Sequence, residues 1–466
     1  MGRETFETTP HENSPPQTGK TSSSAAGATA ILSTLKHGLS RSGISGSFSS
    51  FSKVNKFGGF DCPGCAWPDP DDHRTIAEFC ENGAKAVADE ATKKKITSDF
   101  FLENSVVDLS KMSDEWLNSV GRLTQPMILH QDSINYEPIS WDDAFEIIAT
   151  ELVKLDNPDE AIFYTSGRTS NEAAFLWQLL ARGFGTNNLP DCSNMCHESS
   201  GFALTDSIGI GKGTVKLVDF NSADLILVVG QNPGTNHPRM LTALRDAKKN
   251  GASIISINPL VETGMKKFKH PQNPLEMLGS GKSISDKHVR IKINGDLAFF
   301  RGLNHSLIKN GHYDDKFISK YTDGFENYKN SITNVDWKEI QSTSGITRDE
   351  IESIAEIVAK SQSVITCWAM GITQHHNSVE TIQEMVNTHL LGGHIGRKGA
   401  GVCPVRGHSN VQGDRTVGIN HIASPTLIEN ILRSTGIQTP ENHGYDAVNA
   451  ARAMIDGKGK VFLAMG

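Results

Sequence analysis

Short apolar runs that each end in glycine recur along this chain and form its clearest pattern. The first three are followed by polar loops and then by amphipathic helical patterns over residues 171–182, 239–249 and 379–391. Apolar strands that alternate with helices predict parallel, doubly wound sheets, in which ligands bind at the carboxyl ends of the strands. The four predicted strands are Ala161–Gly167, Leu225–Gly230, Val364–Gly371 and Val461–Gly466.

The loops that follow these strands are rich in groups that bind polar ligands. Residues 166–172, 230–237 and 371–377 are dense in amides, hydroxyls and imidazoles, and none contains a G-x-G-x-x-G sequence or a P-loop lysine. Such loops suit a large cofactor with several phosphates and heterocycles, held by many hydrogen bonds. The alternative is that they are ordinary hydrophilic turns, which explains any single loop but explains their repetition less well.

The composition is that of an ordinary globular protein. Of 466 residues, 37% are hydrophobic and 21% are charged, and no apolar run approaches the ~18 residues of a membrane span. This length predicts roughly two to four domains. The formal net charge of -8 argues against nucleic-acid and anionic-membrane partners.

The first 56 residues differ from the rest in composition. Residues 1–56 are rich in Ser, Thr, Gly and Pro, and we expect them to be disordered. They contain neither the apolar core of a signal peptide nor a twin-arginine pair, which predicts a cytoplasmic protein. Seven cysteines, an odd number without framework spacing, fit a reducing compartment in which thiols serve metals or catalysis.

The densest cluster of titratable ligand types lies at residues 192–198 and contains Cys192, Cys196, His197 and Glu198. Pro190 before it and Gly201 after it predict a loop-to-helix junction. Free backbone N–H groups and the positive helix end at such a junction favour a thiolate over a thiol. The alternative is that Cys192 and Cys196 are small apolar residues packed at helical spacing.

A second group of cysteines lies nearer the N-terminus. Cys62 and Cys65 form a C-x-x-C turn that carries Pro and Gly, and Cys80 follows further along. This spacing is compatible with zinc, an iron–sulfur cluster or a redox disulfide. Because no second close ligand pair follows and several prolines make the loop irregular, the pattern favours an iron–sulfur cluster.

Residues 391–413 are glycine-rich, which predicts a backbone that runs close against another group. Within them, Arg406 and His408 flank a glycine and follow a proline, an arrangement that would present a cation and an imidazole rigidly. A guanidinium can hold a small carboxylate or oxyanion in a bidentate grip. The alternative is an arginine that satisfies loop carbonyls.

Several motifs occur in one fixed order along residues 57–466, and together they resemble a known family. They are Cys62–Asp69, Gly121–Pro126, Ser166–Arg168, Asn194–Glu198, Gln231–Pro233, Trp368–Gln374 and Pro404–Gly413. The set is similar to that of the molybdopterin oxidoreductases related to formate dehydrogenase, and most closely to their YdeP-type branch.

This resemblance implies an α/β fold with a small N-terminal iron–sulfur domain and two Rossmann-like doubly wound sheets, as in formate dehydrogenase and DMSO reductase. Residues 57–122 would form the cluster domain. Residues 123–190 plus 408–466 would form a discontinuous α/β cofactor-binding domain, and residues 191–407 a second α/β domain inserted into it.

The resemblance also implies that two molybdopterin guanine dinucleotides hold one molybdenum, and that a 4Fe-4S cluster passes electrons to an acceptor protein or subunit. The small-molecule substrate would be formate or a similar compound, oxidised by two electrons. Cys196 falls at the molybdenum-ligand position, His197 falls beside it, and Arg406 falls where the formate carboxylate is held. Cys62, Cys65 and Cys80 fall at cluster-ligand positions. Cofactor contacts are implied for Ser166, Gly167, Arg168, Asn171, Gln231, Asn232, His237, Asn258, Gly295, Asp296, Gly371 and Gln374.

Some positions depart from the family pattern. Asp69 stands where a third cluster cysteine is usual, Asn82 where a lysine is usual, and His408 where a glutamine is usual. Asn258 begins Asn-Pro-Leu in place of Asp-Pro-Arg. His408 favours one alternative to formate oxidation, the reduction of another small oxyanion, and Asp69 favours the other, a catalytically silent scaffold. Members of the family also continue beyond a strand such as Val461–Gly466, so we expect this chain to bind the molybdenum cofactor weakly.

Overall fold

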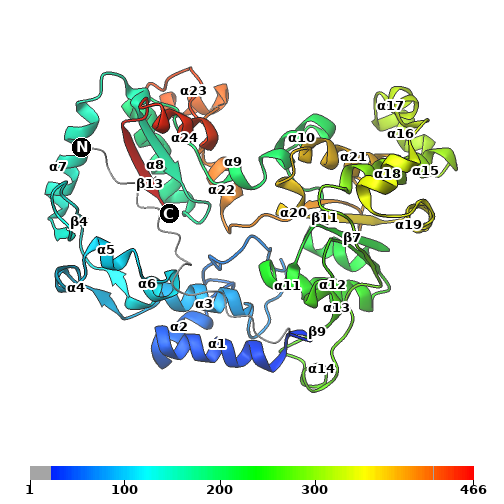
Figure 1. Cartoon of the computed structure of the whole chain (residues 1–466), viewed down its shortest axis with the longest axis horizontal. Helices are drawn as coiled ribbons and strands as arrows, with labels where there is room; N and C mark the ends of the chain where they lie inside the picture. Colours follow the sequence, from blue (N-terminus) through cyan, green and yellow to red (C-terminus); the bar gives the residue numbers. More distant parts are fainter. Residues whose placement is uncertain (1–21, 423) are drawn as a thin grey trace.

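The computed structural model describes residues 22–422 and 424–466 and is built around a five-stranded parallel sheet (Figure 1). The strand order is β10-β8-β7-β11-β12, and every neighbouring pair is parallel. The strands are β7 (Leu225–Val229), β8 (Ser253–Ile257), β10 (Lys287–Val289), β11 (Val364–Trp368) and β12 (Gly401–Pro404). Two of the apolar runs that predicted strands, β7 and β11, lie side by side within this sheet.

Side chains of β7 alternate between the two faces of the sheet, as successive residues of a strand do. Leu225, Leu227 and Val229 join the hydrophobic cluster on one face, whereas Ile226 and Val228 join the cluster on the other. Both faces are covered, so this sheet is doubly wound as predicted. The first face packs against α10 (Glu198–Ile208), α15 (Asp296–Lys309), α19 (Arg348–Lys360) and α21 (Ser378–Leu391), and the second against η2 (Leu217–Ser222), α12 (Met240–Lys249) and α13 (Thr263–Lys266).

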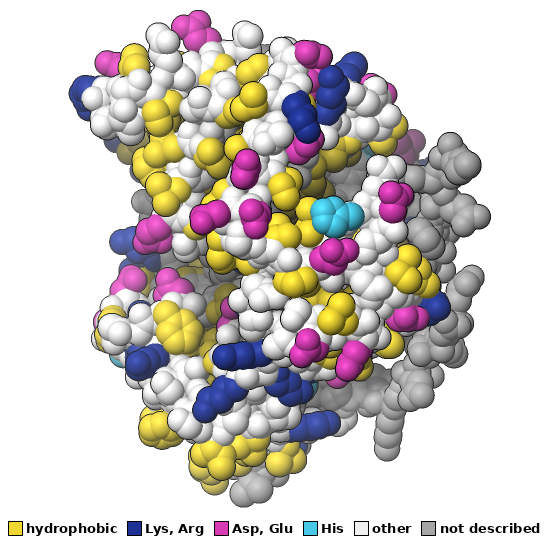
Figure 2. All heavy atoms as spheres, turned by 90° about the vertical axis from the view of Figure 1, so that its left-hand side faces the viewer, with side chains coloured by type: hydrophobic (Ala, Val, Ile, Leu, Met, Phe, Trp, Pro, Cys, Tyr) yellow, Lys and Arg dark blue, Asp and Glu magenta, His cyan; other side chains and the backbone are white. Residues whose placement is uncertain are grey.

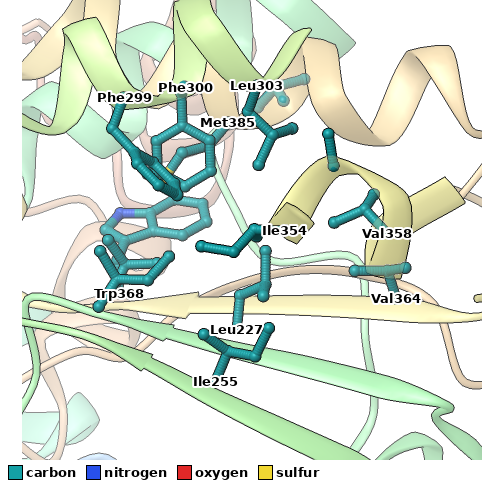
Figure 3. Close-up of a cluster of buried hydrophobic side chains, with 14 of the residues drawn as sticks. Leu227, Ile255, Phe299, Phe300, Leu303, Ile354, Val358, Val364, Trp368 and Met385 are labelled. Atoms are coloured by element: carbon teal, nitrogen blue, oxygen red, sulfur yellow. The ribbon is translucent and has the colours of Figure 1, made fainter. Parts of the chain in front are cut away.

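The larger of the two clusters fixes the carboxyl end of β11. Trp368, the last residue of β11, lies against Phe299 and Phe300 of α15, and all three side chains are fully buried (Figure 3). Burial of each large apolar side chain contributes roughly 1.5–3 kcal/mol. The indole N–H, the polar atom of Trp368, donates to the Ser200 hydroxyl at 2.9 Å. The start of the loop after β11 is therefore firmly anchored.

A second α/β unit contains β6 (Ala161–Thr165) and β13 (Val461–Met465), which pair in parallel. The second doubly wound sheet expected from the sequence is wrong for the described residues, because this sheet has only two strands. The N–H groups of Phe163 and Thr165 donate to the carbonyls of Asn188 and Pro190, at 2.9 and 3.1 Å. This segment covers the other edge of β6 but cannot continue as a regular strand, because Pro190 has no N–H to return.

Helices flank the two-stranded sheet on the left of Figure 1, whereas the five-stranded sheet lies on the right and α22 (Val411–Thr416) lies between them. The flanking helices are α7 (Trp141–Val153), α8 (Asn171–Phe184), α23 (Pro425–Thr435) and α24 (Ala447–Ile455). Together with α12 and α21, α8 confirms the three predicted helices. The four predicted strands are likewise present as β6, β7, β11 and β13.

The N-terminal part is helical where disorder was expected. Residues 27–51 form α1 (Gly27–Arg41) and α2 (Gly43–Phe51), so that prediction is wrong there, while residues 1–21 lie outside the described residues. Both helices pack on α3 (Glu81–Glu90), beside which they run in Figure 1. The Ser33 hydroxyl donates to Glu81 at 2.6 Å, and Arg41 pairs with Asp89 at 3.4 Å. Tertiary packing of this kind, rather than intrinsic propensity, supplies most of the stability of helices in proteins.

The remaining elements are short. Residues 61–80, which carry the predicted cluster cysteines, contain no helix or strand. The predicted domain boundaries at residues 122–123, 190–191 and 407–408 remain predictions. The short elements are β1 (Ala25–Ala26), β2 (Lys95–Ile96), α4 (Ser98–Glu103), α5 (Val106–Leu109), α6 (Asp114–Val120), β3 (Arg122–Leu123), β4 (Met127–Ile128), β5 (Glu137–Pro138), η1 (Pro158–Glu160), α9 (Ser193–Cys196), α11 (Pro233–Asn236), β9 (Phe268–Lys269), α14 (Pro274–Leu278), α16 (Asp315–Tyr321), α17 (Phe325–Ile332), α18 (Trp337–Ser344) and α20 (Met370–Thr373).

On the side of the molecule where α7 lies, hydrophobic side chains are scattered among acidic and basic ones (Figure 2). None of the residues of α7 is buried, and Trp141, Phe145 and Val153 are more than half exposed. No helix within the described residues combines the length and the hydrophobicity that crossing a bilayer requires.

Candidate functional site

The loops that follow β7, β8 and β11 meet at one edge of the five-stranded sheet, because parallel strands carry their carboxyl ends on the same side. Gly230 has a φ of 58°, and a Cβ at Gly371 would overlap the carbonyl oxygen of Gly230. The Asn258 side-chain amide donates to the Gln231 carbonyl at 3.2 Å. The predicted cofactor-binding residues Gln231, Asn258 and Gly371 therefore lie along one edge.

Residues from α9 and from the segment after β12 bring the three predicted catalytic residues together. The Arg406 guanidinium donates to the carbonyl oxygens of His197, at 3.2 Å, and Gly211, at 3.0 Å. Gly407 lies against the sulfur of Cys196, which is 3.7 Å from the position that a Cβ at Gly407 would take. All three predicted side chains are nine-tenths or more buried. Arg406 thus satisfies loop carbonyls, as the alternative interpretation expected, and also places its charge beside Cys196.

The loop after β11 supports α9 from the other side. The Thr373 hydroxyl donates to the Cys196 carbonyl at 2.6 Å, and the Gln374 amide donates to the Met195 carbonyl at 2.7 Å. Gln374, a predicted cofactor contact, therefore holds the short helix that presents Cys196.

A chain of hydrogen bonds fixes His197 as a neutral imidazole. The Trp368 indole donates to the Ser200 hydroxyl, which in turn donates to His197 Nδ1 at 3.0 Å. His197 Nε2 donates to the Val405 carbonyl at 3.0 Å. Burial, reinforced by the nearby Arg406, lowers the pKa of His197 to about 3. With both ring nitrogens engaged, His197 orients the segment after β12 rather than exchanging protons.

The electrostatics at Cys196 work in two directions. Burial raises the pKa of the Cys196 thiol above its usual value, while the Gly407 N–H and the Arg406 guanidinium act to lower it. A metal ion that bound this sulfur would displace the proton, because only the thiolate is a ligand.

The loop after β6 meets the same glycine-rich segment. The Asn410 N–H donates to the Gly167 carbonyl at 2.8 Å, and the Asn410 side chain donates to Asn171 Oδ1 at 2.9 Å. A Cβ at Gly167 would lie 3.0 Å from the Cβ of His408. Predicted residues from the two α/β units thus meet around residues 407–410.

Two further residues of that loop make contacts elsewhere. The Ser166 N–H donates to the Met465 carbonyl at 2.8 Å, which ties the loop to the end of β13. Arg168 Nε donates to the Pro63 carbonyl at 2.9 Å. Arg168 therefore connects the loop after β6 with the turn between the predicted cluster ligands Cys62 and Cys65.

His237 and Asn232, which follow β7, have their side chains engaged by the protein itself. His237 Nε2 donates to the Arg406 carbonyl at 2.8 Å, and burial lowers the pKa of this histidine. Asn232 accepts from the Thr235 N–H at 3.3 Å and donates to Glu262 at 2.8 Å. His237 lies with the predicted catalytic residues, whereas Asn232 serves mainly to start α11.

Gly295 and Asp296 begin α15. A Cβ at Gly295 would lie 2.8 Å from the Ser344 Cα, so the predicted glycine is required there by close packing. The Asp296 carboxylate is 3% exposed, and burial raises its pKa to about 7. It lies 3.9 Å from Nδ1 of His375 in the loop after β11.

The three predicted cluster cysteines line one cavity of about 350 Å³. Cys62 accepts a hydrogen bond from the Gly64 N–H at 3.3 Å, and Cys80, the N-cap of α3, accepts one from the Gly83 N–H at 3.4 Å. Burial raises the pKa of all three thiols, that of Cys80 to about 11. Among residues 22–422 and 424–466, however, no three His, Cys, Asp or Glu side chains are gathered closely enough to hold a metal ion.

Asp69, which stands at the place of a third cluster cysteine, lines the same cavity but is already paired. Arg239 donates to Asp69 at 2.6 Å and also forms an ion pair with Glu78. All three side chains are largely buried. Removal of one partner from a buried pair is strongly destabilising, so Asp69 is held as a structural carboxylate rather than as a free ligand.

The sequence alone did not point to the charged group behind Cys192 and Cys196. Arg415 of α22 pairs with Asp191, at 2.8 Å, and with Glu198, at 2.9 Å. Asp414 beside it is 1% exposed, and burial together with the nearby Asp191 raises its pKa to about 7. The partners are more than two hundred residues apart in sequence, so no spacing could have revealed them.

Comparison with known proteins decides the family of this chain. The sequence profile described as Molybdopterin oxidoreductase matches residues 122–466. The chain belongs to the molybdopterin oxidoreductase family. The resemblance inferred from the motifs is thereby confirmed.

Relatives within the molybdopterin oxidoreductases include an uncharacterized oxidoreductase of Mycobacterium bovis, 50% identical over 95% of this chain and 58% of the relative. Protein YdeP of Escherichia coli is 45% identical over 89% of this chain and 56% of YdeP, which supports the predicted branch. Formate dehydrogenase H of Escherichia coli is 30% identical over 74% of this chain and 48% of that enzyme. The chain spans a little over half the length of the first two relatives.

Among solved structures, acetylene hydratase from Pelobacter acetylenicus matches with a TM-score of 0.50 and 19% identity, over 58% of this chain and 35% of that chain. At this identity the likeness concerns the fold alone.

The molybdopterin oxidoreductase family implies a molybdenum–pterin cofactor, and the residues present fit one. Buried polar atoms without a partner among the described residues are costly, at roughly 1–3 kcal/mol each. Several lie in or beside the loops after β6, β7, β8, β11 and β12, where the polar groups of a pterin cofactor would pair with them. They are Thr169 Oγ1, Gln231 Oε1, Ser256 Oγ, Asp296 Oδ1, His375 Nδ1, Asn377 Oδ1 and Arg406 Nε.

Proposed function

We propose that this chain is part of a molybdenum-dependent oxidoreductase that oxidises formate, or a similar small carboxylate, by two electrons. The observation that carries the proposal is the buried meeting of Cys196, His197 and Arg406 beside the ligand-binding edge of the sheet. A thiol ligand and a guanidinium side by side suit a site that holds both a metal and a small anion.

The protein residues would orient the reactants. Arg406 would hold the substrate carboxylate, since each terminal guanidinium nitrogen retains a second N–H beyond those given to His197 and Gly211. Cys196 would bind molybdenum through its sulfur. His197, held neutral, would fix the position of the Val405 carbonyl and thereby that of the next residue, Arg406. The bis(molybdopterin guanine dinucleotide) cofactor supplies the two-electron redox chemistry when bound.

The electron path is part of the same proposal. Cys62, Cys65 and Cys80 would hold a 4Fe-4S cluster through three sulfurs, and Asp69 would not supply a fourth ligand because Arg239 engages it. Electrons released from the substrate would leave through this cluster to an acceptor protein or subunit.

A second candidate is reduction of another small oxyanion, favoured by His408. This histidine lies against Gly167, and burial together with the charge of Arg168 lowers its pKa, so it would be neutral at pH 7. A neutral imidazole could donate a hydrogen bond to a polar substrate without adding charge.

Metal analysis of anaerobically purified protein tests the proposal. We expect molybdenum that is lost in Cys196→Ser, at less than one atom per chain because this chain is expected to bind the cofactor weakly, and several irons per chain that are lost in Cys62→Ser. The matched control Cys403→Ser changes a cysteine outside both groups and should lose neither metal. Protein that contains a single zinc or no metal would overturn the proposal and favour a silent scaffold.

Dye-linked assays with formate and with oxyanions distinguish the two reactions. If formate is the substrate, Arg406→Lys should lower kcat/KM for formate roughly tenfold or more, because an ammonium cannot reproduce the guanidinium fork. Formate-independent activity on an oxyanion would favour the second candidate instead.

A further inference from the structure

Two cysteines outside the proposed site face each other across neighbouring strands. Cys367 of β11 and Cys403 of β12 are register partners in the five-stranded sheet. Neighbouring strands lie about 4.7–4.9 Å apart. Cysteines joined by a disulfide have Cα atoms about 4.4–6.8 Å apart. The backbone therefore already holds this pair at a distance that a disulfide accepts.

The side chains of the pair lie on the same face of the sheet. Cys367 is fully buried in the cluster beneath α12, and Cys403 packs against that cluster while remaining only half-buried. The two thiols lie close enough for Cys403 to act, after burial, in raising the pKa of Cys367. β12 is the edge strand of its sheet, so Cys403 is the member that a small reagent reaches first.

We propose that Cys367 and Cys403 form a reversible thiol–disulfide site that responds to hydrogen peroxide. Cys403 sulfur attacks the peroxide, the O–O bond breaks, and water leaves as a sulfenic acid forms on Cys403. Cys367 sulfur then attacks that sulfur, the S–O bond breaks, and a second water leaves. The two thiols lose two electrons and two hydrogens, and the peroxide is reduced to water.

The bond would draw β12 toward β11. Linked cysteines need Cβ atoms about 3.5–4.5 Å apart, which is closer than the spacing of paired strands. Strained disulfides have higher reduction potentials and are reduced easily, so the bond should be reversible.

The pair lies directly before the residues that connect β11 and β12 to the proposed site. The Val405 N–H donates to the Trp368 carbonyl at 2.8 Å, and the Val405 carbonyl receives His197. Arg406 follows directly. Oxidation at Cys403 therefore acts on the strand that leads into the buried cationic site.

Peptide mapping of the full chain tests the proposal. After limited hydrogen peroxide and alkylation of the remaining thiols, we expect two fewer free thiols than the seven of the reduced chain and a linked peptide pair that contains Cys367 and Cys403. Dithiothreitol should restore both thiols. Cys65→Ser removes another cysteine that packs against the same cluster, and it should leave the link intact.

Variants of the pair itself separate the two steps. Cys403→Ser should form no link. Cys367→Ser should leave the sulfenic acid on Cys403 without its resolving thiol, and labelling of Cys403 by dimedone should rise several-fold above wild type. Circular dichroism and thermal unfolding establish that each variant is folded. Folded wild type that forms no such link, or that joins Cys403 to Cys65 instead, would overturn the proposal.

Discussion

Asp414 illustrates how a single buried carboxylate couples this site to pH. Its Oδ1 accepts from Asn410 at 3.2 Å, whereas its Oδ2 has no partner among the described residues. Because burial and Asp191 raise the pKa of Asp414 in the folded state to about 7, above the ordinary aspartate value of 3.8, folding is penalised as pH rises between those values. We expect Asp414→Asn to raise the free energy of unfolding by on the order of 2 kcal/mol more at pH 8 than at pH 5. Denaturant titrations at both pH values measure this difference.

The matched control is Asp323→Asn at an exposed position, which should show no such difference between the two pH values. Equal effects of Asp414→Asn at pH 5 and pH 8 would contradict the raised pKa of Asp414.

Residue types were readable from the sequence, but their pairings were not. The spacing of Cys62 and Cys65 and the neighbours of Cys196 predicted candidate ligands, because short spacings constrain geometry locally. The ion pair of Asp69 with Arg239 joins residues 170 positions apart, so no local pattern encodes it. Nor does a local pattern show that the three predicted cluster thiols line one cavity without meeting at metal-binding distance.

At the scale of elements, the loops after β7 and β11 cross at Gly230 and Gly371 with no room for a side chain. We expect Gly371→Ala to lower the free energy of unfolding by about 2–4 kcal/mol, because the added Cβ overlaps backbone that cannot rotate away. Gly201→Ala is the matched control. It lies inside α10 with nothing within 4 Å of an added Cβ, so it should be neutral or stabilising by about 0.5–1 kcal/mol. Thermal and denaturant unfolding compare the two; equal effects would show that the crossing can relax.

Elements with strong apolar periodicity were predicted correctly, and elements made by packing were not. β7 and β11 are five-residue apolar runs buried on both faces, so composition alone marks them. In contrast, α1 and α2 have serine- and glycine-rich sequences, and contacts with α3 stabilise them. Composition measures how much apolar surface a segment offers, but not whether another element covers it.

At the scale of the whole molecule, residues 405–410 join the two α/β units. The Val405 N–H pairs with the end of β11, and Asn410 bonds to the loop after β6 through its N–H and through its side chain, which donates to the Thr169 carbonyl at 2.7 Å. We expect Asn410→Ala to lower the free energy of unfolding by about 1–2 kcal/mol and to speed amide exchange in residues 166–171. Asn430→Ala on the exposed face of α23 should do neither. Hydrogen exchange followed by mass spectrometry measures both, and unchanged exchange in that loop would contradict the proposed attachment.

The architecture was predicted in part. The alternation of apolar strands and amphipathic helices predicted the doubly wound five-stranded sheet. The same pattern predicted a second sheet of that kind, but the sheet formed by β6 and β13 has only two strands in the described residues. The sequences of β6 and β13 predict ordinary apolar strands but do not show how many strands join them, because strand pairing is a long-range property. The segment that ends in Pro190 covers one edge of β6 and does not extend the sheet.

Residues 405–410 also limit how the two α/β units can move relative to each other. This short segment bonds to β11 at one end and to the loop after β6 at the other, so a rotation of one α/β unit against the other would strain it. Arg406 belongs to this segment and lies beside Cys196 of α9, the short helix that follows the residues bonded to β6. A change in the angle between the units would therefore alter the distance between the Arg406 guanidinium and the Cys196 thiol, even if the substitution that caused it lay far from both.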